Sequence, residues 1–128
     1  MKKVKYFTPE EARKTLPLVK RILRDIISAG ETMRRRAASI EGNVIEDTEI
    51  QNIATAINDY LNELEEIGCY YKDWNFTVGL VDFPSIIHGK EVMLCWRSDE
   101  EEIRYYHEAD AGYSGRKLIP EEYFLHNI

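Results

Sequence analysis

The stretch "RYYHEADAGYSGRKLIP", at positions 104–120, concentrates side chains that could bind a metal ion. His107, Glu108 and Asp110 offer an imidazole and two carboxylates, ligands that suit zinc, manganese or iron. Neighbouring side chains on a strand point to opposite faces, so His107 and Glu108 cannot bind one ion if the strand continues through both. His107 and Asp110 can, if the strand ends after His107. A divalent metal ion is therefore a candidate cofactor, and a core histidine hydrogen-bonded to a carboxylate is the alternative.

The turn that follows, "GYSGR" at positions 112–116, has the residue types of an anion site. Its two glycines allow backbone N–H groups to face one point, and Arg116 adds a permanent cation that suits phosphate or carboxylate. The spacing is not that of a P-loop, because no Gly-Lys-Ser/Thr follows. The alternative is a glycine-shaped turn in which Arg116 closes a salt bridge.

Asp82 interrupts the apolar run "GLVDFP", where a buried carboxylate requires a partner. Arg97 or Arg116 could supply that partner without any ligand. In the functional alternative, Asp82 is a general base beside His107, and the two arginines hold an anionic substrate. Asp82 or His88 would also be the third ligand of a metal ion bound by His107 and Asp110.

Two helices must precede these residues. The segment "TPEE" at positions 8–11 is a helix start, in which Thr8 and Glu11 can form a capping box. A second helix is expected to start near Thr48, with Gln51 as its capping partner, and to stop at Gly68. Apolar or small residues of the first helix recur as a heptad seam at positions 12, 16, 19, 23, 26, 30, 33, 37 and 40.

The short connection at positions 42–47 predicts an antiparallel helical hairpin over residues 8–68. The first helix, of about 30 residues, is longer than the second, of about 20, and would overhang it by some 15 Å. The seam at positions 33–40 would then be uncovered within one chain. This overhang favours a homodimer through the long helices, or another partner helix.

After Gly68 the hydrophobic period becomes that of strands. The segments at positions 69–84, 91–97 and 102–108 are rich in β-branched and aromatic residues. They predict a small antiparallel sheet of three to four strands, with 91–97 as a central strand because both its faces are apolar. The predicted fold class is α+β, in a single domain over residues 1–128: the hairpin at 8–68, then the sheet and C-terminal turn at 69–128.

Composition limits the classes of function. The net charge of −6 argues against a general nucleic-acid binder, although residues 1–41 alone hold eleven Lys and Arg against five Asp and Glu. A basic helix lying against an acidic one in the same molecule is the favoured explanation. No segment is long and apolar enough to span a bilayer, and no apolar stretch follows the N-terminal lysines. We therefore expect a cytoplasmic protein with two reduced, buried cysteines.

Four signatures in order carry a family resemblance: "FTPEEARKTLPLV" near the start, "GLVDFP" at 79–84, "LCWR" at 94–97 and "YYHEADAGYSGR" at 105–116. Together they resemble a prokaryotic family known as domain of unknown function 2203, over nearly the whole chain. Tyr106 stands where a tryptophan is common. The resemblance implies a small soluble domain and implies no particular activity.

The residues favour a non-enzymatic domain that binds a ligand or partner, with a polar site for a small anion near the C-terminus. Tyr113 would join the site as part of an aromatic wall. One alternative is a metal-dependent hydrolase of a small phosphorylated or carboxylated molecule, and another is a helix-mediated scaffold without a small-molecule site. The predicted ligand-binding residues are Asp82, Arg97, His107, Tyr113 and Arg116.

Overall fold

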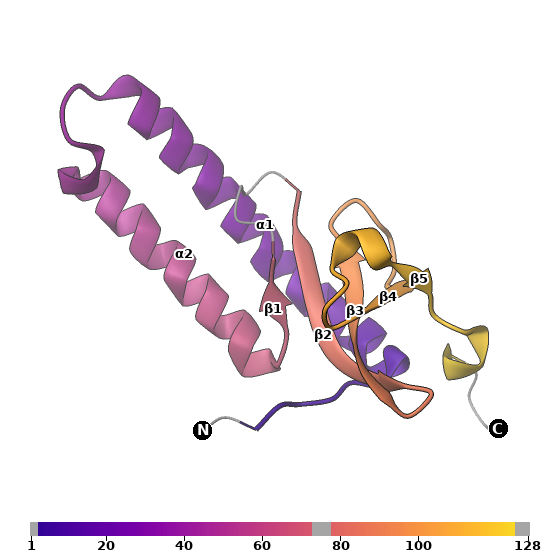
Figure 1. Cartoon of the computed structure of the whole chain (residues 1–128). Helices are drawn as coiled ribbons and strands as arrows, with labels where there is room; N and C mark the ends of the chain where they lie inside the picture. Colours follow the sequence, from indigo (N-terminus) through magenta and orange to yellow (C-terminus); the bar gives the residue numbers. More distant parts are fainter. Residues whose placement is uncertain (1–2, 73–77, 125–128) are drawn as a thin grey trace.

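A helical hairpin precedes an antiparallel sheet (Figure 1). The computed structural model describes residues 3–72 and 78–124. The helices and strands are α1 (Pro9–Ser39), α2 (Thr48–Ile67), β1 (Tyr70–Tyr71), β2 (Leu80–Ile87), β3 (Lys90–Arg97), β4 (Tyr105–Glu108) and β5 (Lys117–Leu118). This layout confirms the predicted α+β class. The sheet has five strands instead of three or four, because two-residue strands lie at both edges. Residues 73–77, inside one predicted strand segment, lie outside the described residues.

Helix α1 begins as its sequence predicts. The Thr8 hydroxyl accepts a hydrogen bond from the Glu11 backbone N–H at 3.1 Å, and the Glu11 carboxylate accepts one from the Thr8 N–H at 2.9 Å. The capping box predicted for α2 is wrong. Asp47 caps that helix by accepting from the Ile50 N–H at 3.0 Å, and Gln51 instead donates to a carbonyl of the connecting loop. An aspartate one residue earlier provides the N-cap oxygen that Thr48 would have provided.

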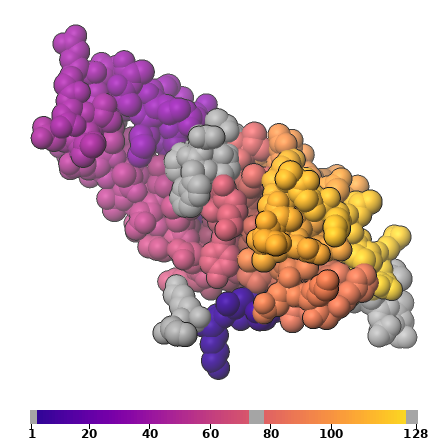
Figure 2. All heavy atoms as spheres, in the orientation of Figure 1, coloured from indigo at the N-terminus to yellow at the C-terminus, as the bar shows by residue number. Residues whose placement is uncertain are grey.

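The heptad seam of α1 is buried only in the half of the helix that adjoins the sheet. Its positions are buried as far as Gly30, whereas Met33, Ala37 and Ile40 are half-buried. In Figures 1 and 2 the end of the hairpin extends beyond the sheet. Helix α2 runs beside this end of α1, so the extra length of α1 lies at its N-terminal end and the overhang predicted at positions 33–40 is wrong. On the connecting loop, Ile45 is 79% exposed. Self-association through the long helices stays a prediction, because a single chain does not test it.

The strands follow sequence order across the sheet, β1-β2-β3-β4-β5, so β3 is central as predicted. On one face, Phe83, Leu94 and Trp96 are at most 1% exposed and belong to the same core cluster as Leu16 and other seam residues of α1. Alternate residues of a strand point to opposite faces, so Asp82, next to Phe83, lies on the other face of the sheet. The helices therefore cover one face, and Asp82, the predicted site residue on β2, belongs to the opposite one.

Gly79, just before β2, lies against helix α1. A Cβ atom at this position would be 2.1 Å from Cδ2 of Leu23 and 2.7 Å from its Cγ, and Leu23 is itself buried in the core. Gly79→Ala is therefore expected to lower the free energy of unfolding by about 1–3 kcal/mol through overpacking, measured by urea denaturation. In a Leu23→Ala background the same change should cost little, because the clash is gone. Equal losses in both backgrounds would contradict this close approach.

The residues before α1 pair with β2 on the same side as β1, further along that strand. The Phe7 N–H donates to the Pro84 carbonyl at 2.7 Å, and the Ser85 hydroxyl donates to the Phe7 carbonyl at 2.5 Å. The Phe7 ring packs edge-on against Phe83, with ring centroids 5.3 Å apart. In Figure 2 the N-terminal segment (indigo) lies directly against the orange atoms of the sheet. This contact joins two segments of the chain that are 78 positions apart.

The basic residues of α1 are compensated within the chain, but mainly by loops. Arg36 makes two hydrogen bonds to the Asp47 carboxylate, at 2.8 and 3.1 Å, before α2 begins. Arg13 lies 3.7 Å from the Glu102 carboxylate, and Lys20 donates to the Glu101 carbonyl in the loop between β3 and β4. Internal contacts thus involve Arg13, Lys20 and Arg36. Among the described residues, no helix is long and apolar enough to cross a membrane. The cytoplasmic location stays a prediction.

Candidate functional site

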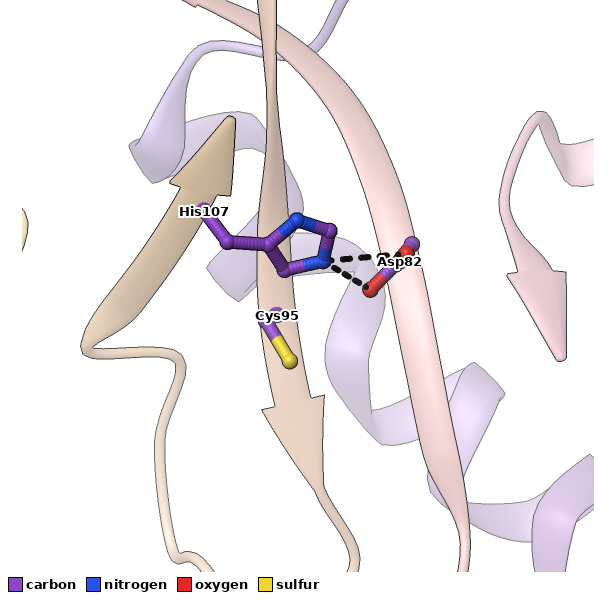
Figure 3. Close-up of side chains that lie close together, drawn as sticks. All are labelled: Asp82, Cys95 and His107. Atoms are coloured by element: carbon purple, nitrogen blue, oxygen red, sulfur yellow. Dashed lines mark hydrogen bonds and ion pairs between the residues drawn. The ribbon is translucent and has the colours of Figure 1, made fainter. Parts of the chain in front are cut away.

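Asp82, Cys95 and His107 meet on the face of the sheet opposite the helical core (Figure 3). Asp82 on β2 is directly opposite Cys95 on β3. His107 on β4 is opposite Met93, two residues from Cys95 and therefore on the same face. The potential ligand atoms of the three residues all lie within 4.8 Å of one another, and none of the residues is more than 4% exposed. We call these three residues the Asp–Cys–His cluster.

The partner of Asp82 is His107. Nε2 of His107 is 3.2 Å from each of the two Asp82 carboxylate oxygens. The prediction that Arg97 or Arg116 pairs with Asp82 is therefore wrong. Sequence alone could not choose among these partners, because the choice depends on strand register: His107 lies across β3 from Asp82 on the same face, and both arginines are engaged elsewhere.

The other nitrogen of His107 limits where protons can sit. Nδ1 is 2.8 Å from the Glu108 backbone carbonyl, which can only accept, so Nδ1 carries a hydrogen. A hydrogen bond between Nε2 and the Asp82 carboxyl group then requires a second proton between these two atoms. It is bonded either to Nε2 or to an Asp82 oxygen. Burial raises the pKa of Asp82 above its usual value, and the charge and hydrogen bond of His107 oppose that rise. In both proton positions the buried pair is neutral overall.

Cys95 was missed as a site residue. Its sequence context indicated only a reduced, buried cysteine, and it is indeed free and buried, like Cys69. Burial, and to a smaller extent the nearby Asp82, raises the pKa of the Cys95 thiol to about 12, and Arg116 acts in the opposite direction. At neutral pH the thiol is therefore protonated. One signal was available: Asp82, Cys95 and His107 each interrupt an apolar or aromatic strand.

A second group of predicted residues lies beside the cluster. Arg97 and Arg116 both donate to the Tyr113 hydroxyl, at 3.0 and 3.4 Å. Arg116 also donates to the Cys95 carbonyl at 3.0 Å and to the Glu100 carboxylate at 2.5 Å. We call Arg97, Tyr113 and Arg116 the arginine clamp. The predicted ligand site is thus divided into two adjoining parts, which Arg116 and Cys95 connect.

The arginine clamp packs against aromatic rings, and not all of its N–H donors form hydrogen bonds. The Arg116 guanidinium lies 4.1 Å from the ring centroid of Tyr105 and 4.7 Å from that of Tyr113. The Nε atoms of both arginines are buried and have no hydrogen-bond acceptor among the described residues. Nε of Arg97 is 3.1 Å from an Asp99 oxygen, an ion pair that lacks hydrogen-bond alignment.

The glycine turn does not form an N–H nest at these positions. Residues 113–115 form a short 3-10 helix, in which the Gly115 N–H donates to the Gly112 carbonyl and the Arg116 N–H to the Tyr113 carbonyl. Those two donors are therefore used inside the turn. Gly112 has a φ of 67°, a backbone conformation that glycine adopts without strain. The glycines shape the loop that places Tyr113 and Arg116 over the sheet, as the structural alternative predicted.

The predicted metal ligands do not come together. Glu108 lies on the opposite face of β4 from His107, is exposed, and has an oxygen 3.8 Å from Nζ of Lys117. Asp110 is exposed in the turn after β4. His88 is exposed between β2 and β3 and faces Glu122 at 3.7 Å. Of the third ligands considered, Asp82 alone joins His107.

A cavity of about 530 Å³ lies on the other side of the loop between β3 and β4. Leu23 and Trp96 contribute apolar surface, and Lys20, Arg24 and Glu100 contribute charges. The sequence does not indicate this cavity, because the residues that line it come from α1 and from a loop about 75 residues later. Its link to the predicted site is Glu100, whose carboxylate contacts Arg116.

Comparison with known proteins confirms the family resemblance. Residues 5–119 match the family model described as "Uncharacterized conserved protein (DUF2203)". No curated protein and no solved structure matches the chain. The matched range contains both helices, all five strands, the Asp–Cys–His cluster and the arginine clamp. The chain therefore belongs to the DUF2203 family of uncharacterized conserved proteins.

Proposed function

We propose that the protein is a non-enzymatic binding domain whose arginine clamp holds a small oxyanion, a phosphate or a carboxylate. The observation that carries this proposal is the convergence of two guanidinium groups on one tyrosine hydroxyl while both Nε–H groups lack an acceptor. A buried donor without an acceptor costs about 1–3 kcal/mol, and an oxyanion supplies several acceptors at once. Tyr113 is 41% exposed, so the clamp reaches the protein surface, and a shift of the arginine side chains would open the buried Nε–H groups to a small ligand.

The carboxylate of Glu100 already binds to the arginine clamp as an oxyanion ligand would. One oxygen of Glu100 accepts from the Arg116 guanidinium at 2.5 Å and from the Arg97 backbone N–H at 2.8 Å. Arginine binds carboxylate and phosphate oxygens in the same fork geometry, so both classes of ligand suit the remaining donors. Asp99 and Glu100 balance the two arginine charges. Because these charges cancel, the net electrostatic attraction for an anion is modest. The ligand would be held mainly by hydrogen bonds from the arginines.

Binding without catalysis fits the side chains at the clamp. Glu100 already accepts two hydrogen bonds, and the nearest thiol, Cys95, is protonated at neutral pH because of its raised pKa. Of the described residues, those that touch the clamp offer no activated nucleophile. The two arginines position an anion, and no group beside them is prepared to attack it.

The test is inorganic phosphate binding at constant ionic strength, followed by thermal unfolding. For the wild-type protein we expect the melting temperature to rise with phosphate and not with chloride, because a ligand that binds only the folded state stabilises it. Arg97→Gln removes one donor of the clamp and should weaken phosphate binding about tenfold, the loss of one charge-assisted hydrogen bond.

Arg104→Gln is the matched control, because it makes the same charge change at an exposed arginine that forms an ion pair with Glu102, outside the clamp. Its phosphate response should equal that of the wild type. Equal weakening in both variants would show only a general charge effect. That result, or a wild-type protein that does not respond to phosphate, would refute the proposal.

A further inference from the structure

We propose that the Asp–Cys–His cluster binds one divalent transition-metal ion of the zinc class. The proposal concerns side chains other than those of the arginine clamp and does not depend on anion binding. Three donors of different chemistry, a carboxylate, a thiol and an imidazole, come from three adjacent strands and lie within 4.8 Å of one another. Among the described residues they are the one such group of three that could hold an ion.

The spacing of the donors already suits tetrahedral zinc. Zinc–nitrogen and zinc–oxygen bonds of 2.0–2.1 Å at a tetrahedral angle separate the two ligand atoms by about 3.3 Å. His107 Nε2 and the Asp82 oxygens are 3.2 Å apart. A zinc–sulfur bond places the thiolate about 3.6 Å from the other ligand atoms. The ligand atoms lie within 4.8 Å of one another, so the Cys95 sulfur needs to approach the other two by up to about 1.2 Å.

His107 is oriented as a metal ligand. Its Nδ1 hydrogen bonds to the Glu108 carbonyl, so Nε2, the nitrogen directed at Asp82, is the one available to an ion (Figure 3). Metal-binding histidines almost always donate their second N–H to a carbonyl or carboxylate, which fixes the ring and its tautomer. Arg116, bonded to the Cys95 carbonyl, provides a nearby positive charge that favours a thiolate.

Charge balance selects a divalent ion. Without metal the cluster is neutral and holds a thiol proton and the proton shared by Asp82 and His107. A divalent ion with an aspartate, a thiolate and a neutral imidazole is also neutral, so two protons leave when one ion enters. Burial strongly penalises net charge, and none of the three residues is more than 4% exposed. A monovalent ion would leave a buried negative charge.

The donor set selects the class of metal. Magnesium and calcium take oxygen ligands and would not use the thiolate or the imidazole. Zinc accepts sulfur, nitrogen and oxygen ligands together, and cobalt(II) can replace it as a spectroscopic probe. Three protein donors are the number found in catalytic zinc sites, where a water or substrate completes the coordination. The full burial of the cluster favours a structural ion in this conformation.

The other chemistry open to these residues is a cysteine nucleophile with a histidine base. That arrangement needs an imidazole nitrogen directed at the thiol, whereas the two nitrogens of His107 are used by the Glu108 carbonyl and Asp82. The thiol is also buried, with a pKa raised to about 12. Both facts oppose a nucleophile and fit a ligand that loses its proton only when a metal ion takes its place.

Cobalt(II) and zinc titrations of the full chain, stripped of metal with a chelator, test the site. We expect one ion per chain and, with cobalt, the near-ultraviolet charge-transfer absorption that a thiolate ligand produces. Cys95→Ser should abolish this absorption and weaken zinc binding at least about 100-fold, the upper end of losses seen even for second-shell changes. Cys69→Ser, which removes the other buried thiol, should change neither.

Asp82→Asn provides a second variant if Cys95→Ser does not fold, as judged by circular dichroism without metal. It should keep the thiolate absorption and weaken zinc binding at least about tenfold. Arg97→Gln should retain full metal binding, so failure of the anion site and failure of the metal site are distinguishable. A wild-type protein without a stoichiometric ion or thiolate absorption, or an absorption that Cys69→Ser removes as fully as Cys95→Ser does, would overturn the proposal.

Discussion

Replacing His107 with leucine is expected to lower the free energy of unfolding by about 3–5 kcal/mol, because it leaves the buried Asp82 carboxyl group without its partner. Both residues are 4% exposed and interact at 3.2 Å. Urea denaturation in the presence of a chelator measures the loss, so that a bound metal ion does not contribute.

The matched control is the double variant Asp82→Leu, His107→Leu. Replacing a buried polar pair with apolar side chains of similar size is often close to neutral, so the double variant should be more stable than either single variant. The double-mutant cycle then reports a coupling free energy between the two residues. Additive single losses would show that they do not interact, which contradicts the geometry of Figure 3.

Trp96→Ala is expected to have an effect of similar size, about 3–5 kcal/mol, measured by the same denaturation. Trp96 is 1% exposed and belongs to the core cluster, and its indole N–H donates to the Glu100 carbonyl at 2.9 Å. Its removal leaves a large void between β3 and α1. It also releases the loop that carries Glu100, so phosphate affinity at the arginine clamp should change as well.

Trp96→Phe separates these two effects. Phenylalanine keeps most of the apolar volume and loses the indole N–H, so the expected loss falls to about 1–3 kcal/mol, while the Glu100 carbonyl remains without its donor. If Trp96→Phe were as damaging as Trp96→Ala, the hydrogen bond and not the core packing would dominate. If neither variant lowered stability, the packing described here would be wrong.

The helices were predictable because their signals are local. The capping box of Thr8 and Glu11 and the stop at Gly68 depend on residues within one turn, and both are confirmed. The cap of α2 was wrong because Asp47 and Thr48 are adjacent residues with similar capping ability, and the interaction of Asp47 with Arg36 favours the aspartate. The two-residue edge strands are too short to have a period of their own.

The site was predictable only in part, because its contacts depend on strand register. Asp82 and His107 were named from their chemistry, but pairing them requires knowing that they lie across β3 on the same face. Cys95 enters the cluster for the same reason. Glu108 was discounted as a joint ligand with His107 by alternation along the strand, and the structure places it on the opposite face. Residue type indicated the chemistry, and register decided the partners.

The contact of Phe7 with Ser85 has a consequence for synthesis on the ribosome. The two residues are 78 positions apart, whereas each strand of the sheet pairs with one that directly precedes or follows it. Hairpins between successive strands can close soon after they emerge, but Phe7 has no edge to join until β2 has left the exit tunnel. Until then Phe7 has no strand to pair with, and its docking joins the segment before α1 to a strand that is translated 78 positions later.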